Sequence, residues 1–344
     1  MSDTNCRHAE TPCPPLALTG LVGSHPLGAL AAFGLLRWSA EIPALRGARL
    51  HWELQDDWIA VLTPPAPLDA DALCRLLLDA HVANQWPHLD SDELEMPAED
   101  FRERCLTHLE TSNIQDRFTI DFDAAIGCDA IIGKNGNIKT TLLNMTSGNQ
   151  SFLDKLKSLK KSLIPINRKK HRQEPSRLIC SLKEAMFGPW TYSDDEHPLG
   201  WDPTMERDHA FRAQAPTNDD KYRSVRFAIW LAHLSLPVLP CIPSGRHLHT
   251  MSFAPERYKP PYRFRWPIWQ TPIALDSLSA LLSSPELTGE DKDVSNLYQR
   301  GVSAVYESSR QWRNKGLAIF KHPLLISPAA PQVRRSAPAG PLVF

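Results

Sequence analysis

The strongest chemical signal in this sequence is a run of basic residues between Ser151 and Arg177. Nine lysines and arginines stand there against two acids, whereas the whole chain has a formal net charge of −1. The segment therefore has an excess of about +7, and the rest of the chain carries about −8. Lysine-rich surfaces neutralise phosphates and bind nucleic-acid backbones in a salt-dependent way. The candidate contacts are Lys155, Lys157, Lys160, Lys161, Arg168, Lys169, Lys170 and Arg172.

Two other interpretations of this charge remain open, an acidic protein partner and a solvated surface with no partner. An ordinary solvated face mixes charges of both signs, and this segment does not. The sequence therefore favours nucleic acid, without distinguishing RNA from DNA or a single strand from a duplex.

A second phosphate-binding candidate runs from Gly133 to Thr140. Its order, Gly-Lys-Asn-Gly-Asn-Ile-Lys-Thr, nearly fits the phosphate loop G-x-x-x-x-G-K-[ST]. Ile138, however, stands where the motif has its second glycine, at a position whose backbone conformation glycine accepts. The pattern predicts a surface loop without ATP chemistry, in which Lys134 and Lys139 contact a phosphate backbone.

Acidic and histidine pairs suggest an alternative function, a metal-dependent nuclease or hydrolase. Asp194, Asp195 and Asp202 are possible ligands of a divalent ion, and His247 and His249 share one face of an expected strand. Zinc needs three or four convergent ligands, and this spacing matches no established site. The chain also has no G-x-S-x-G elbow and no C-x-x-C pair. We therefore predict no catalytic residue, no metal and no cofactor.

Positioning the basic residues requires a helix and the segment after it. Phe152, Leu156, Leu159 and Leu163 recur at helical spacing, which places the lysines on the opposite face. Pro165 ends this pattern, so the second basic cluster is expected in a loop.

Elsewhere the sequence alternates between helical and strand patterns. Helices are expected after the turn at 19–26, where small residues such as Gly28 and Gly34 would let another element approach closely, and after the cap Asp69. Further helices are expected at 222–234 and 276–282, with strands at 48–54, 58–62, 118–122, 131–132 and 247–253. Three prolines from Pro237 to Pro243 predict an extended segment, and 297–320 should hold a helix or a strand pair.

These patterns show no regular βαβ rhythm, so they predict an α+β fold with mixed short-stranded sheets and packed helices. The length of 344 residues indicates one large domain or two intimately packed domains. The expected divisions are a disordered N-terminus (1–14), an α+β region (15–188) that contains the basic segment 151–177, a Trp/Pro-rich region (189–327) and a flexible tail (328–344).

The cysteines and the absence of long apolar runs indicate the compartment. Seven scattered cysteines without a paired motif are typical of a reducing cytoplasm. No signal peptide or run of about 18 apolar residues occurs in the sequence. We expect a cytoplasmic protein with no membrane contact.

Two motifs are rich in tryptophan, Gly200-Trp201-Asp202-Pro203 and the run from Phe264 to Trp269. Aromatic rings beside arginines can stack on unpaired bases. They more often pack in a core or anchor a protein interface, and we expect packing here.

These motifs are part of an ordered set that resembles a known family. The set comprises Leu18 to Arg37, Ser147 to Leu153, Gly200 to Pro203 with Arg207, Leu236 to Pro240 with Thr250, and Phe264 to Trp269 with Pro272. It is similar to motifs of accessory and large-subunit-like proteins of type I-G (formerly I-U) CRISPR–Cas loci, including the helicase–nuclease extension family. In this chain the resemblance singles out Gly200, Trp201, Asp202, Pro203, Arg207, Trp266, Pro267 and Trp269 as structural or interface residues.

The resemblance implies a non-catalytic prokaryotic component of antiviral defence that works with a crRNA-guided effector complex or its helicase–nuclease. The implied partners are crRNA or target DNA and the protein subunits of that complex. A purely structural subunit that bridges other proteins is a further alternative.

Overall fold

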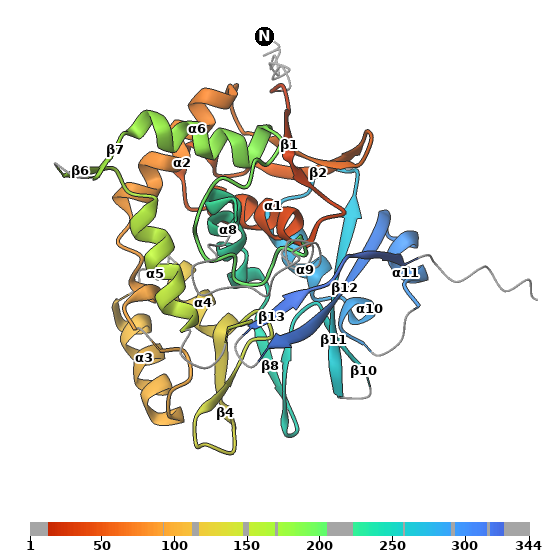
Figure 1. Ribbon diagram of the computed structural model, residues 1–344. Coiled ribbons are helices and arrows are strands. Elements are labelled where there is room, and N and C mark those ends of the chain that lie inside the picture. Colours follow the sequence, from red (N-terminus) through yellow and green to blue (C-terminus); the bar gives the residue numbers. More distant parts are fainter. Residues whose placement is uncertain are drawn as a thin grey trace, which may run out of the picture.

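The computed structural model describes residues 13–91, 93–111, 117–146, 151–168, 171–204, 223–256, 259–289, 293–314 and 317–326. Helices pack around several small antiparallel sheets (Figure 1), which confirms the predicted α+β class. Lys169, Lys170, Arg207, Tyr222 and most of the Ser147 to Leu153 motif lie outside the described residues, as do both predicted terminal segments for nearly all of their length.

The N-terminal sheet has the strand order β1-β3-β2, with β1 (Leu16–Val22), β2 (Arg49–Leu54) and β3 (Trp58–Thr63) all antiparallel. The expected hairpin at 48–62 is confirmed. Thr19, expected in a turn, instead lies inside β1. Leu18 and Gly20 are buried, whereas Thr19 between them is exposed. This alternation explains the strand, because successive side chains of a strand point to opposite faces of the sheet and only one face packs on the core.

Helix α1 (Pro26–Ser39) is buried along its whole length and packs against α8 (Arg226–His233). A side chain at Gly34 would overlap the Leu231 carbonyl of α8, and one at Gly28 would overlap Val22. The predicted close approach at small residues is therefore confirmed. Helix α2 (Ala70–Ala83) begins as expected, with the Asp69 carboxylate accepting a hydrogen bond from the Ala72 amide at 2.7 Å.

The C-terminal sheet has the order β10-β11-β12-β13, and β14 also pairs with β12. Its strands are β10 (Phe253–Glu256), β11 (Lys259–Trp269), β12 (Val302–Asn314), β13 (Leu317–Phe320) and β14 (Leu324–Ile326). Phe264, Trp266 and Phe320 stack in the core on one face. Short helices α9 (Leu275–Leu282), α10 (Pro285–Thr288) and α11 (Ser295–Gln299) accompany this sheet. Helix α9 matches the expected helix at 276–282.

Helices α3 (Ala98–Thr111) and α4 (Phe118–Ile126) precede two hairpins that lie together at one end of the molecule (Figure 1). These are β4 (Gly127–Ile132) with β5 (Ile138–Thr140), and β8 (Cys241–Ser244) with β9 (His247–Thr250). Helix α5 (Phe152–Ser162), hairpin β6 (Ile166–Arg168)–β7 (His171–Gln173) and helix α6 (Pro175–Phe187) follow one another along a neighbouring side. One hydrophobic cluster joins these parts and includes residues from Leu18 to Phe320.

One local prediction was wrong and two held only in part, since β9 covers the first four residues of the strand expected at 247–253 and Pro243 lies in the extended strand β8. The segment 118–122 is helical because Phe118, Phe122 and Ala125 bury one helical face; its apparent alternation misled the strand assignment. Pro237 lies in a short 3₁₀ helix (Leu236–Val238), a position that its fixed φ tolerates at a helix start. The expected strand 247–253 is interrupted at Ser252, whose φ of 63° lies in the left-handed region.

Within the described ranges, no helix has both the length and the apolar composition needed to cross a lipid bilayer.

Candidate functional site

The basic segment folds as a helix and then a hairpin. On α5, Phe152, Leu156 and Leu159 are buried, and Leu163 beyond the helix end is buried too, which confirms the predicted amphipathic face. Lys161 is exposed and Lys155 is half-buried. After Pro165 the chain forms β6–β7, where a loop was expected, and register pairs Asn167 with Arg172.

Two of the predicted lysines also bind this protein's own backbone. Lys157 Nζ donates to the Asp90 carbonyl at 3.0 Å, and Lys160 Nζ donates to the Gln85 carbonyl at 2.5 Å. Burial lowers the pKa of Lys160 below its ordinary value. These bonds hold α5 against the segment around the 3₁₀ helix Pro87–Leu89 and fix where the two charges stand.

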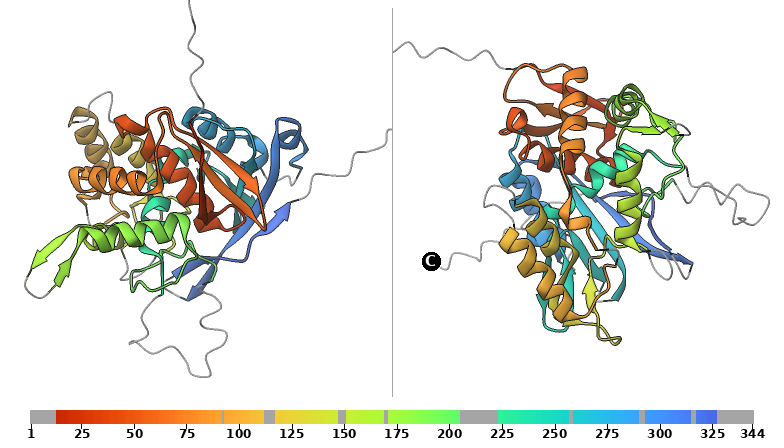
Figure 2. Two further views of the ribbon diagram at one scale, coloured as in Figure 1. Left: turned by 90° about the horizontal axis from the view of Figure 1, so that it is seen from above. Right: turned by 90° about the vertical axis from the view of Figure 1, so that its left-hand side faces the viewer.

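The hairpin β6–β7 extends away from the body of the molecule beside α6 (Figures 1 and 2). The backbones of Arg168 and Arg172 belong to its two strands. We call residues 151–177, which comprise α5, this hairpin and the start of α6, the basic arm.

Lys134 and Lys139 lie in the β4–β5 hairpin, away from α5 along the chain and in Figure 1. Lys134 is exposed in the turn, where Gly136 has a φ of 83°. Ile138 is buried against the core, so it packs where a phosphate loop would need glycine. Lys139 Nζ donates to the Arg246 carbonyl at 3.3 Å and lines a small pocket together with His247 and His249. The fold thus brings Lys139 next to His247 and His249, which the sequence suggested as two separate candidate sites.

Two motifs of the family resemblance, through Asp202 and Trp266, contact a third at Gly23 and His25, in the loop between β1 and α1. Trp266 Nε1 donates to the Gly23 carbonyl at 2.7 Å, and a side chain at Gly23 would come within 2.8 Å of Trp52. His25 Nε2 lies 3.3 Å from an Asp202 carboxylate oxygen. Sequence reasoning missed this pair, because nothing local links two residues so far apart in the chain.

The expectation that the tryptophan motifs pack in the core is confirmed. Trp201 and Trp266 are fully buried, and Trp269 is nearly so. Each ring nitrogen donates to a backbone carbonyl: Trp201 to Leu143 at 3.0 Å and Trp269 to Leu50 at 2.9 Å. A buried indole N–H usually has a hydrogen-bond acceptor. Because these acceptors lie in remote parts of the chain, the tryptophans connect distant segments.

Ser24, His25 and two carboxylates lie close together without forming a catalytic triad. In a triad, one histidine nitrogen must accept the serine proton. His25 Nδ1 accepts the Gly28 amide hydrogen at 3.4 Å and its Nε2 faces Asp202, while the Ser24 hydroxyl donates to Asp57 at 2.5 Å. Both ring nitrogens are therefore engaged elsewhere. Burial raises the pKa of Asp202, but the contacts from His25 and Thr204 outweigh it and hold that pKa below its ordinary value.

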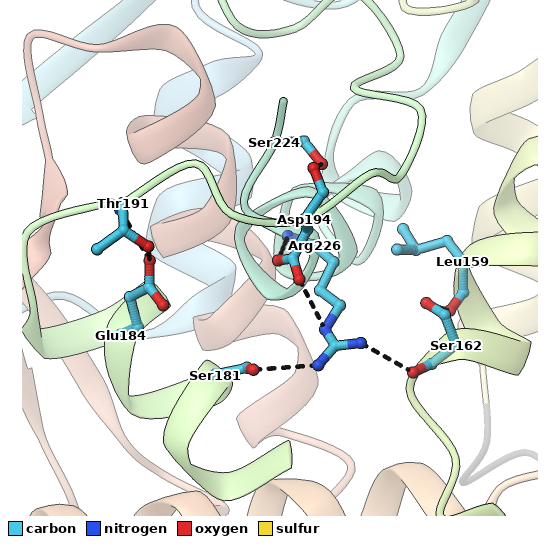
Figure 3. Close-up of polar contacts among 8 residues, drawn as sticks. All are labelled: Leu159, Ser162, Ser181, Glu184, Thr191, Asp194, Ser224 and Arg226. Atoms are coloured by element: carbon cyan, nitrogen blue, oxygen red, sulfur yellow. Dashed lines mark hydrogen bonds and ion pairs between the residues drawn. The ribbon is translucent and has the colours of Figure 1, made fainter. Parts of the chain in front are cut away.

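Asp194, a candidate metal ligand, is held by an arginine (Figure 3). Its carboxylate lies 3.3 Å from Arg226 Nε and accepts the Arg226 amide hydrogen at 2.9 Å. The same guanidinium donates to the Ser162 carbonyl at 3.4 Å and to the Ser181 hydroxyl at 3.1 Å. Arg226 thus connects α8 with the end of α5 and with α6. In the described ranges, no three His, Cys, Asp or Glu side chains are grouped as metal ligands would be.

A larger pocket of about 380 Å³ lies between α3, α4 and β4. Its lining includes Leu106, Leu109 and the thiols of Cys105, Cys128 and Cys241. Burial raises the pKa of both Cys105 and Cys241 to about 11, so these two thiols stay protonated near neutral pH and are weak nucleophiles.

Comparison with known proteins gives no match, since no family model fits the sequence and no curated protein or solved structure is detectably similar to it.

Proposed function

We propose that this chain is a non-catalytic subunit associated with a type I-G CRISPR–Cas effector and that it contacts nucleic-acid backbone through the basic arm. The observation that carries the proposal is the excess of basic residues on α5, which packs against the body, and on the hairpin β6–β7, which extends from it. The ordered motifs of the resemblance, two of which contact the loop at Gly23 and His25, support the family that we propose.

Fixed charges favour phosphate binding. Lys157 and Lys160 are already held in place by the carbonyls of Asp90 and Gln85, so ordering these two side chains costs little when a phosphate approaches. Exposed Lys161 adds charge at the end of the same helix. Each phosphate neutralised releases counterions. We therefore expect the basic arm to bind nucleic acid strongly, with little dependence on base sequence and a strong dependence on salt.

The salt dependence of binding tests this function. We expect the intact protein to shift labelled RNA or DNA, with an affinity that falls steeply as salt rises. Replacing Lys155, Lys161, Lys169 and Lys170 with Gln removes four of the nine basic charges of the basic arm. The slope of log affinity against log salt should then flatten by about 3 to 4 units, since each lost contact contributes about 0.7 to 0.9.

A matched control removes four exposed charges outside the arm, by changing Arg46, Arg49, Arg75 and Arg223 to Gln. This control should keep the slope nearly unchanged. Equal slopes for the arm variant and the intact protein would contradict the proposed contact. Affinity purification from a host that carries the effector genes should also recover effector subunits with crRNA; recovery of neither would contradict the assembly.

A further inference from the structure

Trp312 differs from the other tryptophans in its exposure. All ten tryptophans fall in the described ranges, and Trp312 is the one whose side chain is largely exposed, at 52%. The Arg310 guanidinium lies over its ring, 4.7 Å from the centroid. A stacked arginine holds an indole ring in place, and the exposed part of such a ring can stack with a further planar group.

Tyr262 and Arg310 extend this surface. The register of β11 and β12 places Tyr262 directly opposite Arg310, and Trp312 follows two residues later on the same face. Deeper in the sheet, that face carries Phe264 and Trp266 and is covered by the core. We call Tyr262, Arg310 and Trp312 the aromatic platform. These residues lie on the same face of the sheet as Phe264 and Trp266, beyond the part that the core covers.

A small basic pocket borders the platform at Tyr262. It measures about 120 Å³, and its lining includes Lys139, His247, His249 and Tyr262. Among the described residues that line it, none is acidic. Sites for whole small molecules usually measure about 300 to 1,000 Å³, so this pocket suits a single phosphate-sized group.

Hydrogen bonds connect the pocket to the platform. Thr140 lines the pocket, and its hydroxyl accepts a hydrogen bond from the Asn144 side-chain amide at 3.4 Å. The Asn144 carbonyl in turn accepts from Arg310 at 3.0 Å. These bonds run through the buried Asn144 and hold the two features in place, and Tyr262 belongs to both the pocket lining and the platform. The pocket and the platform therefore adjoin at Tyr262.

We propose that this surface binds an unpaired nucleotide of a single-stranded nucleic acid. The base stacks on the open face of Trp312, and a phosphate of the same strand enters the pocket beside Lys139, His247 and His249. The proposal rests on the proposed function for its class of ligand. It adds a second contact, which distinguishes single-stranded from double-stranded nucleic acid. In a duplex the bases are stacked on one another, so no base has a free face that could stack on Trp312.

Anisotropy of labelled oligonucleotides tests this site, with single-stranded DNA, single-stranded RNA and duplex DNA as separate probes. Trp312→Ala should weaken single-strand binding by about five- to a hundredfold, the range for loss of one base–aromatic stack. Duplex binding should change less than twofold. Trp312→Phe should retain part of the affinity, and Gln311→Ala, on the opposite face of β12, should bind like the intact protein.

The same variants distinguish failure of this site from failure of the arm. If Trp312→Ala binds single strands normally while the four-lysine variant binds them weakly, the platform proposal is overturned and the arm remains. If the intact protein binds none of the probes, both proposals fail. Unchanged melting of Trp312→Ala excludes misfolding, and cross-linking of a halogenated-uracil strand to the peptide that contains Trp312 would support the site directly.

Discussion

His81, His88 and His233 meet in the interior, where charged imidazoles are costly. His88 Nε2 lies 3.0 Å from His233 Nε2, and His81 packs edge-on against Trp230. Burial lowers the pKa of His81 to about 4 and that of His233 to about 3, and it lowers the pKa of His88 well below its ordinary value. The fold therefore requires all three rings to be neutral.

This requirement predicts a loss of stability in mild acid. Below about pH 6.5 the unfolded chain binds protons at these histidines, whereas the folded chain does not until about pH 4 for His81. The free energy of unfolding should fall by about 1.4 kcal/mol per pH unit for each histidine in that window. Urea unfolding at pH 7 and pH 5 measures the loss, and His81→Phe should reduce it by roughly 2 kcal/mol.

Phe33→Leu, a core change without a titrating group, provides the comparison for the pH experiment. It should lower stability equally at both pH values. An acid dependence of His81→Phe identical to that of the intact protein would show that His81 does not take part.

At the scale of elements, Arg226 joins three helices through one guanidinium, as Figure 3 shows. Removing it leaves Asp194 partly buried without its counter-charge, and burial already raises the pKa of that carboxyl. We predict that Arg226→Met lowers the free energy of unfolding by about 3 kcal/mol. Adding Asp194→Asn should restore part of the loss, because it removes the stranded charge.

Arg223 provides a close control for Arg226. It forms an exposed ion pair with Asp195 at 3.9 Å, so Arg223→Met should change stability by no more than about 0.5 kcal/mol. Equal effects of the two arginine changes in denaturant melts would contradict the connecting role of Arg226.

Several elements could be predicted from local pattern, and others could not. Helices α1, α2, α5 and α9 and the β2–β3 hairpin follow from periodicity, caps and turn residues, which act within a few positions. The segment 118–122 failed because its alternation is equally readable as a strand. The carbonyl partners of Lys157 and Lys160 and the contact of His25 with Asp202 come from remote segments, so only the tertiary fold reveals them.

At the scale of the whole molecule, charge is divided between the basic arm and everything else. The arm carries about +7 and the remaining chain about −8. Under the proposed function, such a body would repel a polyanion while the arm attracts it, and the field would direct a nucleic acid toward the arm and away from most other faces. The formal net charge of −1 for the whole chain does not reveal this separation of charge.

The continuous core predicts one cooperative unfolding event. The main hydrophobic cluster includes α1 from the first half of the chain and α8 from the second, in contact at Gly34. Far-UV circular dichroism and hydrogen exchange should therefore report the same midpoint in denaturant. A fragment ending at residue 188 would leave α1 uncovered, and we expect it to lack protected amides; a stably folded fragment would contradict this.

The exposure of Trp312 has a consequence for optical measurements. Nine indoles are buried or half-buried, whereas this one meets water, so iodide and acrylamide should quench its emission first and leave a blue-shifted remainder. The cationic Arg310 beside the ring should make iodide a better quencher there than caesium. The molecule thus carries a native fluorophore at one defined spot on its surface, and the quenchable fraction of its light reports whether that spot is covered.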